Sequence, residues 1–313
     1  MRLHLPLLFA LALALSPATA LAGPLEDGIA AYKLKDYATA LKLLRPLAIG
    51  GNATAQYNLG LMYDNGQGVA QNDAEAIKWY KSALKLLRPL AIDGNATAQY
   101  YLGLMYGDGQ GVAQNDAEAM KWYKLAAAQG NANAQFNLGS TYATGLGAAQ
   151  DYAEAVKWYR LAAAQGYADA QNSLGVLYRI GKGVAQDYAE AMKWYRLAAA
   201  QGYAEAQFNI GVMYDEGKGV AQDYAEAVKW YRLAAAQGDA SSLLSVGLRY
   251  ATGQGAPMDN IRALMWLFLA ASAGDATAKK SLILIAEKMT SQQIAKAEKL
   301  AQECQARKFK NCD

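Results

Sequence analysis

Few side chains in this sequence could carry out catalysis, and histidine is nearly absent. The 313 residues include one histidine, His4, and two cysteines, Cys304 and Cys312. One short segment, Ser82-Ala83-Leu84-Lys85, has the spacing in which a lysine can activate a serine nucleophile. This spacing occurs by chance in many chains, and the companion Ser-Asp-Asn and Lys-Thr-Gly motifs are absent. We therefore predict a protein that is not an enzyme, with no catalytic residue, no cofactor and no metal site.

The first 22 residues have the features of a secretory signal. Arg2 is followed by an apolar run from Leu5 to Leu15 and then by small residues up to Ala22. The run is too short to span a bilayer, and no later segment is long and apolar enough to do so. We expect cleavage after Ala20 or Ala22 and a periplasmic or secreted mature protein without a membrane span. His4 would be removed with the signal.

The charge and the cysteine content bear on nucleic-acid binding, on zinc binding and on disulfide formation. The chain has 30 Lys and Arg against 27 Asp and Glu, a formal charge of +3, which gives no electrostatic footprint for nucleic acid. Two thiols cannot form a four-ligand structural zinc site. In an oxidising compartment our preferred pairing is a disulfide between Cys304 and Cys312. A free thiol pair and intermolecular bridges remain as alternatives.

Tryptophan spacing shows that the chain is built from repeats. After a first interval of 43 residues, every later interval between tryptophans is 36 residues. The six tryptophans are Trp79, Trp122, Trp158, Trp194, Trp230 and Trp266. A fixed period in this range is typical of a solenoid, in which each unit buries its apolar face against its neighbours. The tryptophans are therefore expected in the core.

The first half of each repeat predicts a helix and a glycine loop. In the unit 167–202, the helical spacing of Ala170, Leu174 and Tyr178 forms one apolar stripe. Gly175 lies inside this helix and recurs in every unit. A mid-helix glycine costs about 1 kcal/mol relative to alanine. We therefore expect a neighbouring helix to approach so closely that no Cβ could fit.

The second half predicts another helix. Asp187 opens it as an N-cap, and Glu190 has the spacing of a capping box. Gly202 ends it. The residues of its apolar face are Ala191, Trp194, Tyr195, Ala198 and Ala199. Each unit is therefore a helical hairpin.

This pattern closely resembles the Sel-one-like repeat family, a branch of the tetratricopeptide-like α-solenoids. The matching residues in one unit are Ala170, Leu174-Gly175, Tyr178, Gly181-Lys182-Gly183-Val184, Asp187, Lys193-Trp194-Tyr195, Ala198-Ala199 and Gly202. The resemblance implies an all-α, right-handed α-solenoid that acts as a scaffold or adaptor for another protein. Some cysteine-rich relatives are linked to β-lactam binding or hydrolysis, so a protein that binds or hydrolyses cell-wall fragments or β-lactams is our alternative. This chain lacks their cysteine pair in each repeat.

The predicted organisation has four parts. They are a signal peptide (1–22), a tetratricopeptide-like hairpin (23–51), six repeats (52–274) and C-terminal capping helices with a tail (275–313). The repeats are 52–94, 95–130, 131–166, 167–202, 203–238 and 239–274. We expect a monomer.

Two regions depart from the repeat. Residues 40–81 recur almost unchanged at 83–124, which adds seven residues to the first repeat. Because seven residues are about two helical turns, we predict a longer helix between Asp73 and Ile92, bent or ended by Pro89. In the sixth repeat, Arg262 and Met265 replace the usual Glu and Lys. We expect its more apolar surface to be covered by two helices, from about Ala276 to Met289 and from Thr290 to about Arg307.

The predicted partner site lies on the first helix of each hairpin, which usually lines the concave groove of such solenoids. Its candidate residues are mostly amides, which can bind an extended peptide backbone. They are Gln56, Asn58, Gln99, Tyr101, Gln135, Asn137, Gln171, Gln207 and Asn209. The alternative is that these side chains are merely solvated polar positions. The sequence does not identify the protein or peptide that would bind there.

Overall fold

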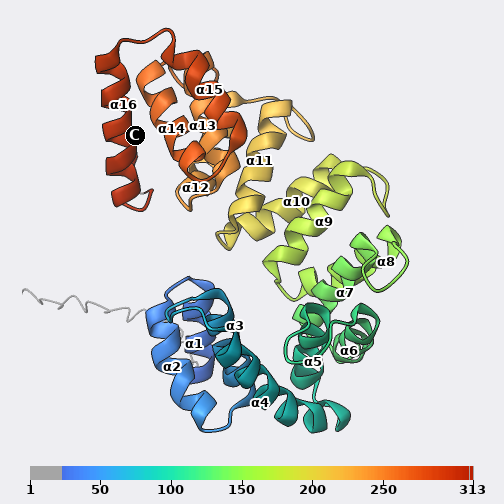
Figure 1. Cartoon of the computed structure of the whole chain (residues 1–313). Helices are drawn as coiled ribbons and strands as arrows, with labels where there is room; N and C mark the ends of the chain where they lie inside the picture. Colours follow the sequence, from blue (N-terminus) through green and yellow to red (C-terminus); the bar gives the residue numbers. More distant parts are fainter. Residues whose placement is uncertain (1–22, 310, 313) are drawn as a thin grey trace, which may run out of the picture. The chain divides into compact units, whose positions relative to one another are not determined.

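The computed structural model describes residues 23–309, 311 and 312. Within these residues it contains sixteen α-helices and no β-strand, so the predicted all-α class is confirmed (Figure 1). The helices are α1 (Pro24–Lys33), α2 (Tyr37–Ile49), α3 (Ala53–Asn65), α4 (Asp73–Ile92), α5 (Ala96–Asp108), α6 (Asp116–Ala128), α7 (Ala132–Thr144), α8 (Tyr152–Ala164), α9 (Ala168–Ile180), α10 (Tyr188–Ala200), α11 (Ala204–Glu216), α12 (Tyr224–Ala235), α13 (Ala240–Thr252), α14 (Asn260–Ser272), α15 (Ala276–Ala286) and α16 (Ser291–Ala306). The predicted signal peptide lies outside the described residues.

The chain forms two compact units. Unit 1 comprises Met1–Pro89 and Gly109–Ala113, and unit 2 comprises Leu90–Asp108 and Gln114–Asp313. Within unit 2 each helix from α5 to α14 packs against the next, and α14 packs against both α15 and α16. In Figure 1 these helices follow an arc from α5 to α16. Stacked helical hairpins of this kind are the α-solenoid that the repeat predicts.

Helix ends follow the predicted capping chemistry with one difference. Asp187 accepts a hydrogen bond from the Glu190 amide (2.9 Å), as an N-cap should. The Glu190 carboxylate, however, pairs with Lys193 (3.1 Å), so it does not complete the predicted capping box. A full capping box forms at the start of α16, between Thr290 and Gln293. The Lys193 ammonium lies one turn further along the helix on the same face as Glu190, so it can pair with the Glu190 carboxylate.

The mid-helix glycines make room for a tyrosine ring from the second helix of the same repeat. A Cβ added to Gly175 would lie 2.6 Å from Cε1 of Tyr195, a distance that real Cβ contacts do not reach. The same arrangement recurs at Gly60, Gly103, Gly139 and Gly211. The expected close approach is therefore confirmed, and its partner is a side chain.

The tyrosines, rather than the tryptophans, fill the centre of each repeat. Tyr195 is fully buried, whereas Trp194 beside it is half-buried. Trp194 packs against a core formed by α8 of the preceding repeat and α9 of its own repeat, and Trp230 packs in the same way against α10 and α11. Trp266 in the sixth repeat is the exception, at 3 % exposure. The prediction that all six tryptophans are core residues thus holds fully for Trp266 and partly for the others.

Helix α4 shows what the seven extra residues do. It runs for 20 residues against 13 in α10, and it continues through Pro89 to Ile92. The predicted lengthening is confirmed, and Pro89 does not end the helix. A Cβ at Gly111 would lie 3.0 Å from the Cβ of Tyr80, near the middle of α4.

A comparison with α2 explains why Gly111 contacts the middle of α4. A Cβ at Gly68 would meet the Cβ of Tyr37, the first residue of α2, at the same 3.0 Å. The segment Tyr80–Ile92 closely repeats the segment Tyr37–Ile49. Helix α4 therefore begins like an ordinary second helix and ends like α2, because the duplication fused the two.

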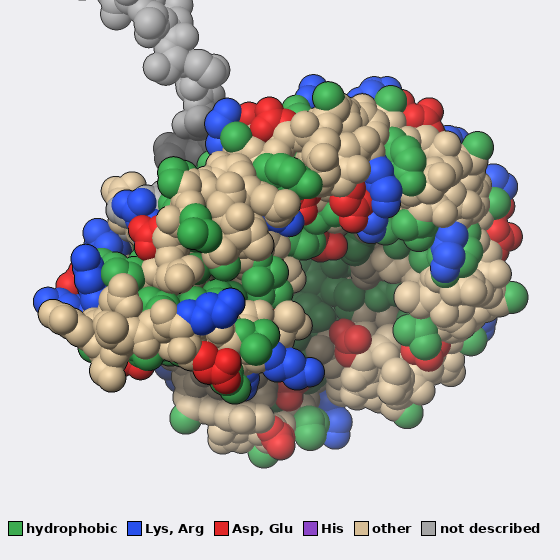
Figure 2. Space-filling view, turned by 90° about the horizontal axis from the view of Figure 1, so that it is seen from above, with side chains coloured by type: hydrophobic (Ala, Val, Ile, Leu, Met, Phe, Trp, Pro, Cys, Tyr) green, Lys and Arg blue, Asp and Glu red, His purple; other side chains and the backbone are tan. Residues whose placement is uncertain are grey.

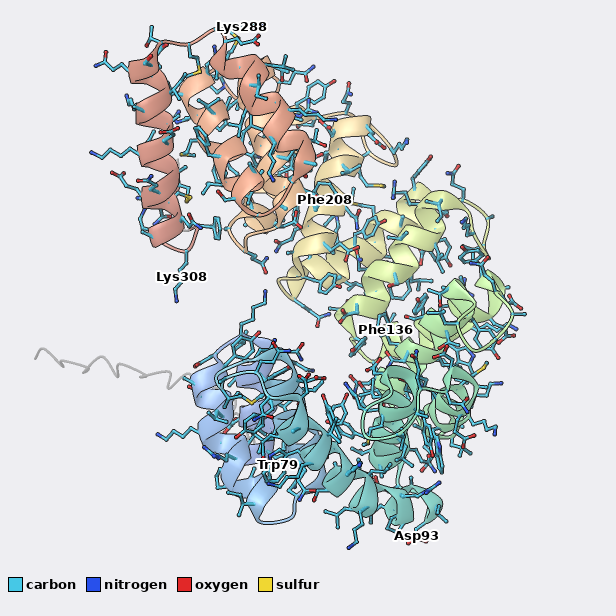
Figure 3. The ribbon with its side chains drawn as sticks, in the orientation of Figure 1. Trp79, Asp93, Phe136, Phe208, Lys288 and Lys308 are labelled. Atoms are coloured by element: carbon cyan, nitrogen blue, oxygen red, sulfur yellow. A yellow bond between two sulfur atoms is a disulfide. The ribbon has the colours of Figure 1, made fainter. Side chains whose placement is uncertain are left out.

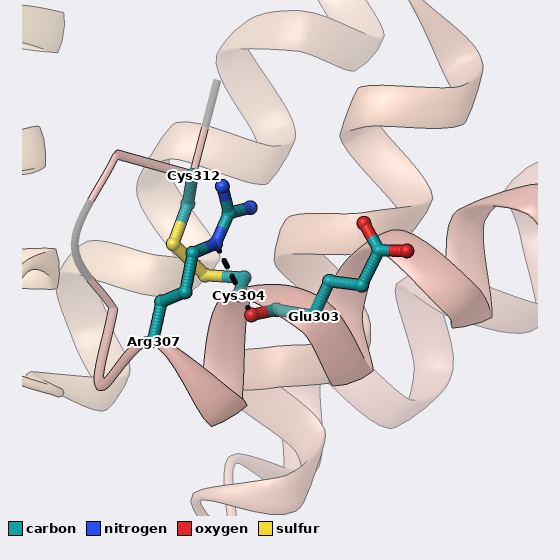
Figure 4. Close-up of a disulfide and its surroundings, with 4 residues drawn as sticks. All are labelled: Glu303, Cys304, Arg307 and Cys312. Atoms are coloured by element: carbon teal, nitrogen blue, oxygen red, sulfur yellow. Dashed lines mark hydrogen bonds between the residues drawn. A yellow bond between two sulfur atoms is a disulfide. The ribbon is translucent and has the colours of Figure 1, made fainter.

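A two-helix cap covers the sixth repeat. Helices α15 and α16 lie within a few residues of the predicted bounds, and both pack on α14. A disulfide joins Cys304 of α16 to Cys312, and Arg307 lies in the loop between them (Figure 4). Cys304, Cys312 and Trp266 belong to the same hydrophobic core. The cap therefore buries the apolar face of the last repeat.

Candidate functional site

The five predicted glutamines lie in the interior, and the amide nitrogens of four of them donate to backbone carbonyls. Each is at most 6 % exposed. The amide of Gln171 donates to the carbonyl of Ala163 in the preceding helix (3.1 Å). Equivalent bonds run from Gln56 to Ala48 (3.0 Å), from Gln99 to Ala91 (3.0 Å) and from Gln135 to Ala127 (3.1 Å). Each bond ties the first helix of a repeat to the helix before it.

The amide oxygens of Gln99, Gln135, Gln171 and Gln207 are also engaged, whereas that of Gln56 is buried without a hydrogen-bond partner. Gln201 donates to the side-chain oxygen of Gln171 (2.8 Å). Gln129 does so to Gln99 (2.7 Å), Gln165 to Gln135 (2.8 Å) and Gln237 to Gln207 (2.9 Å). A buried amide with both ends satisfied fixes the stacking of helices and is costly to disturb. Binding of a partner by Gln56, Gln99, Gln135, Gln171 and Gln207 remains a prediction, and their burial leaves little of these side chains exposed for it.

The other four predicted residues divide into two pairs. Asn58 and Asn209 are buried, and they donate to the Thr54 carbonyl (2.8 Å) and to the Asn172 side-chain oxygen (2.9 Å). Asn137 and Tyr101 are half-buried. Of the nine predicted residues, only these last two keep substantial contact with solvent, and binding by them remains a prediction.

A row of large side chains next to the glutamines was missed. The residue after each glutamine is Tyr57, Tyr100, Phe136, Asn172 or Phe208, and in the sixth repeat Leu243 takes the place of the glutamine and is followed by Leu244. In unit 2, Phe136 packs on Tyr159 (5.7 Å between ring centroids) and Phe208 packs on Tyr231 (5.6 Å). Figure 3 labels Phe136 and Phe208, which flank the position of Asn172 along the chain. The fourth repeat thus has a small polar residue where its neighbours have rings.

A pocket of about 340 Å³ opens at this gap. We call it the α9 pocket, and its main lining residues are Phe136, Asn172, Val176, Leu177, Tyr203 and Glu205. Helices α7, α9 and α11 supply them. A pocket with an aromatic wall, an apolar base and a few polar groups is typical of sites that receive one side chain or a small ligand.

The rim of the α9 pocket is acidic. The Tyr203 hydroxyl donates to Asp169 (3.0 Å), and Glu205 is exposed. Burial and the negative charges of Asp169 and Glu205 raise the pKa of Tyr203, which favours the protonated form that donates to Asp169. The rim therefore favours a ligand with a positive charge.

The starts of two helices carry a signal that could have revealed this pocket. Asn131 caps α7 by accepting a hydrogen bond from the Ala134 amide (2.9 Å). Tyr167 and Tyr203 stand at the equivalent positions before α9 and α11 and make no side-chain cap. Losing a cap costs about 1 kcal/mol. Tyr203 and Asn172 line the pocket, and Tyr167 packs on its Phe136 wall (5.2 Å between ring centroids), so all three departures from the repeat lie in or beside it.

Charged groups further along the face are paired within unit 2. Asp215 binds Arg249 (2.7 Å), and both side chains are mostly buried. Burial raises the pKa of Asp215, while the Arg249 charge opposes that rise. On the face seen in Figure 2, Lys and Arg side chains are interspersed with Asp and Glu side chains. This mixture offers no large single-sign area on that face.

The serine and lysine of the possible catalytic motif form no active arrangement. Ser82 is half-buried on α4 and Lys85 is exposed, and in the described structure no hydrogen bond joins them. Within the same residues, no three His, Cys, Asp or Glu side chains gather as a metal site would require. The described part of the chain also has no helix with both the length and the apolar character to cross a membrane.

Comparison with known proteins identifies the repeat. The family model of the Sel1 repeat matches residues 53–86, 96–131, 132–167, 168–203, 204–239 and 240–275. The chain belongs to the Sel1 repeat family. Members of this family generally serve as protein–protein interaction scaffolds and are generally not enzymes. No curated protein matches the chain.

Two crystal structures of Sel1-type proteins are similar to this one. One is c5321, a protective antigen present in uropathogenic Escherichia coli strains displaying an SLR fold, with a TM-score of 0.63 and 36 % identity. That match covers 86 % of this chain but 56 % of c5321, so this chain spans little more than half of that protein. The other is a Sel1 repeat protein from Oxalobacter formigenes, with a TM-score of 0.58 and 34 % identity, covering 80 % of this chain and 97 % of that one.

Proposed function

We propose that this Sel1 repeat protein is an exported scaffold that binds an extended peptide segment of a partner protein across α7, α9 and α11. The observation that carries the proposal is the α9 pocket, where Asn172 interrupts a row of rings. The pocket receives one apolar side chain of the peptide. Asp169 and Glu205 at the rim favour a Lys or Arg beside that side chain, since opposite charges complement each other across an interface. Tyr101 and Asn137 contribute polar contacts further along.

A panned random-peptide library and two phenylalanine variants test this site. Peptides that bind the full chain should share an apolar residue next to Lys or Arg. Asn172→Phe fills the gap with the ring that the third and fifth repeats carry. Burial of one apolar side chain is worth about 1.5–3 kcal/mol, so this variant should weaken peptide binding at least about tenfold. Leu244→Phe places the same ring in the same row outside the pocket and should leave binding unchanged.

One result would contradict the proposal, and a second would pass the decision to another variant. Equal peptide binding by Asn172→Phe and the unmodified protein would show that the pocket is not used. Loss of helical circular dichroism in Asn172→Phe would mean that the lost bond from Asn209 caused the effect. In that case Glu205→Gln decides, because it should reduce the preference for Lys and Arg without touching the fold.

Export and organisation are part of the same proposal. Residues 1–22 act as the signal, 23–51 form the first hairpin, 52–274 carry the repeats and 275–313 close the array, with the protein acting as a monomer. The N-terminal sequence of the protein recovered outside the cytoplasm should begin at Leu21 or Gly23. Recovery of chains that still begin at Met1 would refute cleavage. Light scattering of the purified protein measures the oligomeric state.

A further inference from the structure

A second pocket lies in the C-terminal cap, where the sixth repeat departs from the other five. In the first five repeats a Glu near the start of the second helix pairs with a Lys three residues later. The pairs are Glu75–Lys78 (3.1 Å), Glu118–Lys121 (2.7 Å), Glu154–Lys157, Glu190–Lys193 (3.1 Å) and Glu226–Lys229 (2.7 Å). In the sixth repeat these positions hold Arg262 and Met265. The ion pair is therefore replaced by a cation beside an apolar side chain.

Helix α16 completes the site that this replacement begins. A pocket of about 340 Å³ lies between α14 and α16, and we call it the cap pocket. Its lining residues are Asp259, Ile261, Arg262, Met265, Lys296, Leu300, Arg307 and Cys312. Ile261, Met265 and Leu300 make an apolar base, and three cations stand around it. This volume lies within the range of specific ligand pockets, at its small end.

The charge of the cap pocket is positive. Asp259 is the one acid that lines it, and its carboxylate already accepts hydrogen bonds from the amides of Ile261 (2.9 Å) and Arg262 (3.0 Å). The second Asp259 oxygen forms a long ion pair with the Arg262 Nε (3.9 Å), too far for a hydrogen bond, and the Arg262 guanidinium also lies over the Tyr250 ring (5.8 Å to its centroid). Three cations against one engaged carboxylate therefore leave an excess of positive charge for a ligand.

The disulfide fixes one wall of this pocket. Cys312 lines it and is bonded to Cys304 of α16. Arg307 lies in the loop that the disulfide closes, and its Nε donates to the Glu303 carbonyl (3.2 Å), as Figure 4 shows. The cation at this side is thus held by covalent and hydrogen bonds, which lowers the entropic cost of binding.

We propose that the cap pocket binds the C-terminal residue of a partner peptide. Its carboxylate would bind Arg262, Lys296 and Arg307, and its apolar side chain would rest on Met265 and Leu300. A C-terminal residue carries a carboxylate and a side chain on one Cα, so both fit a pocket of this size. An Asp or Glu within an extended chain points away from the side chain that follows it. Guanidinium groups bind carboxylates strongly because they offer paired donors.

Fluorescence anisotropy with short labelled peptides that end in leucine tests this site on the full, disulfide-bonded chain. The free-acid peptide should bind and weaken with added salt, because exposed charges are screened. The same peptide with an amidated C-terminus should bind at least about tenfold more weakly, as should Arg262→Gln or Lys296→Gln with the free acid. Lys280→Gln, a change at an exposed lysine of α15 outside the pocket, should bind like the unmodified protein.

Three results would overturn the assignment. They are equal binding of the acid and the amide, full binding by Lys296→Gln, and binding of vesicles of anionic lipid that the free-acid peptide does not displace. If Arg262→Gln lost its helical circular dichroism, Lys296→Gln would decide, because Lys296 is exposed on α16. None of these measurements involves the α9 pocket, so the proposed groove function is tested separately.

Discussion

The fourth and sixth repeats share a backbone plan but differ in what covers their second helix. Helices α10 and α14 both have 13 residues and begin after an aspartate cap. Helix α10 packs against α11 of the next repeat, whereas α14 packs against the cap helices α15 and α16. Helix α10 is followed by another repeat, and there Trp194 is half-buried and Glu190 pairs with Lys193. Where the cap follows, Trp266 is buried and Arg262 faces a pocket. In the sixth repeat the departures from the pattern therefore coincide with a change of the neighbouring helices.

The largest expected effect in this comparison comes from replacing Trp266 and Trp194 one at a time with alanine. Trp266→Ala should lower the free energy of unfolding of the C-terminal helices by about 3–5 kcal/mol, because it empties a closed core. Trp194→Ala should cost roughly half as much, since that ring already meets solvent. Denaturation followed by circular dichroism, with hydrogen exchange to locate the effect, measures both. Equal losses would mean that the cap adds nothing to the burial of Trp266.

The second test separates the cap from the repeats by breaking the disulfide. Closing a loop of this length is worth about 2–3 kcal/mol in the chain-entropy model. Reduction, or Cys312→Ser, should therefore raise hydrogen exchange in α14 and α16 and leave α9 and α10 unchanged. The exchange rates of α9 and α10 are the internal control. A uniform increase along unit 2 would show that the cap and the repeats unfold together.

The third test uses the glycines that face the second helix. Gly175→Ala forces a Cβ to within 2.6 Å of the fully buried Tyr195 ring and should cost about 2 kcal/mol. At Gly247 the Cβ would meet Cγ of the buried Leu267 at 2.9 Å, a less severe overlap. Gly247→Ala should therefore cost less than Gly175→Ala, with the gain of about 1 kcal/mol in helix propensity common to both. Comparing the two denaturation midpoints checks this, and a neutral Gly175→Ala would rule out the tight contact.

The sequence predicted what repeats along the chain and failed where side chains cross between helices. The spacing of the tryptophans and the position of Gly175 identify the helices and their close approach, because both depend on local period. The role of Gln171 could not be read in this way. An amide on a helix looks exposed in a periodic pattern, yet this one reaches the carbonyl of Ala163 in the preceding helix. Packing between elements decides burial, and period alone does not encode it.

The two candidate pockets could not be predicted from the repeat period either. The positions of Asn172 and Arg262 in the sequence do not indicate a cavity. Each is visible in the sequence only as a residue that differs from its counterparts in the other repeats. The α9 pocket needs three helices to form, and the cap pocket needs α16. A search for departures from the repeat finds both positions, but only the fold shows that space opens beside them.

The smallest expected effect concerns the ionisation of Tyr195, which the sixth repeat replaces with Leu267. Burial raises the pKa of Tyr195 to about 12, with the nearby Arg179 opposing the rise. Between pH 10 and 12 the folded protein therefore holds a proton that the unfolded chain releases. Stability from this group is full below pH 10 and is lost as the pH rises toward 12. Hydrogen exchange in α9 and α10, corrected for the intrinsic rate, should accelerate over this range more than in α13 and α14. Tyr195→Phe removes this titrating group and should reduce the difference, and an unchanged difference would mean that other raised phenols such as Tyr203 are responsible for it.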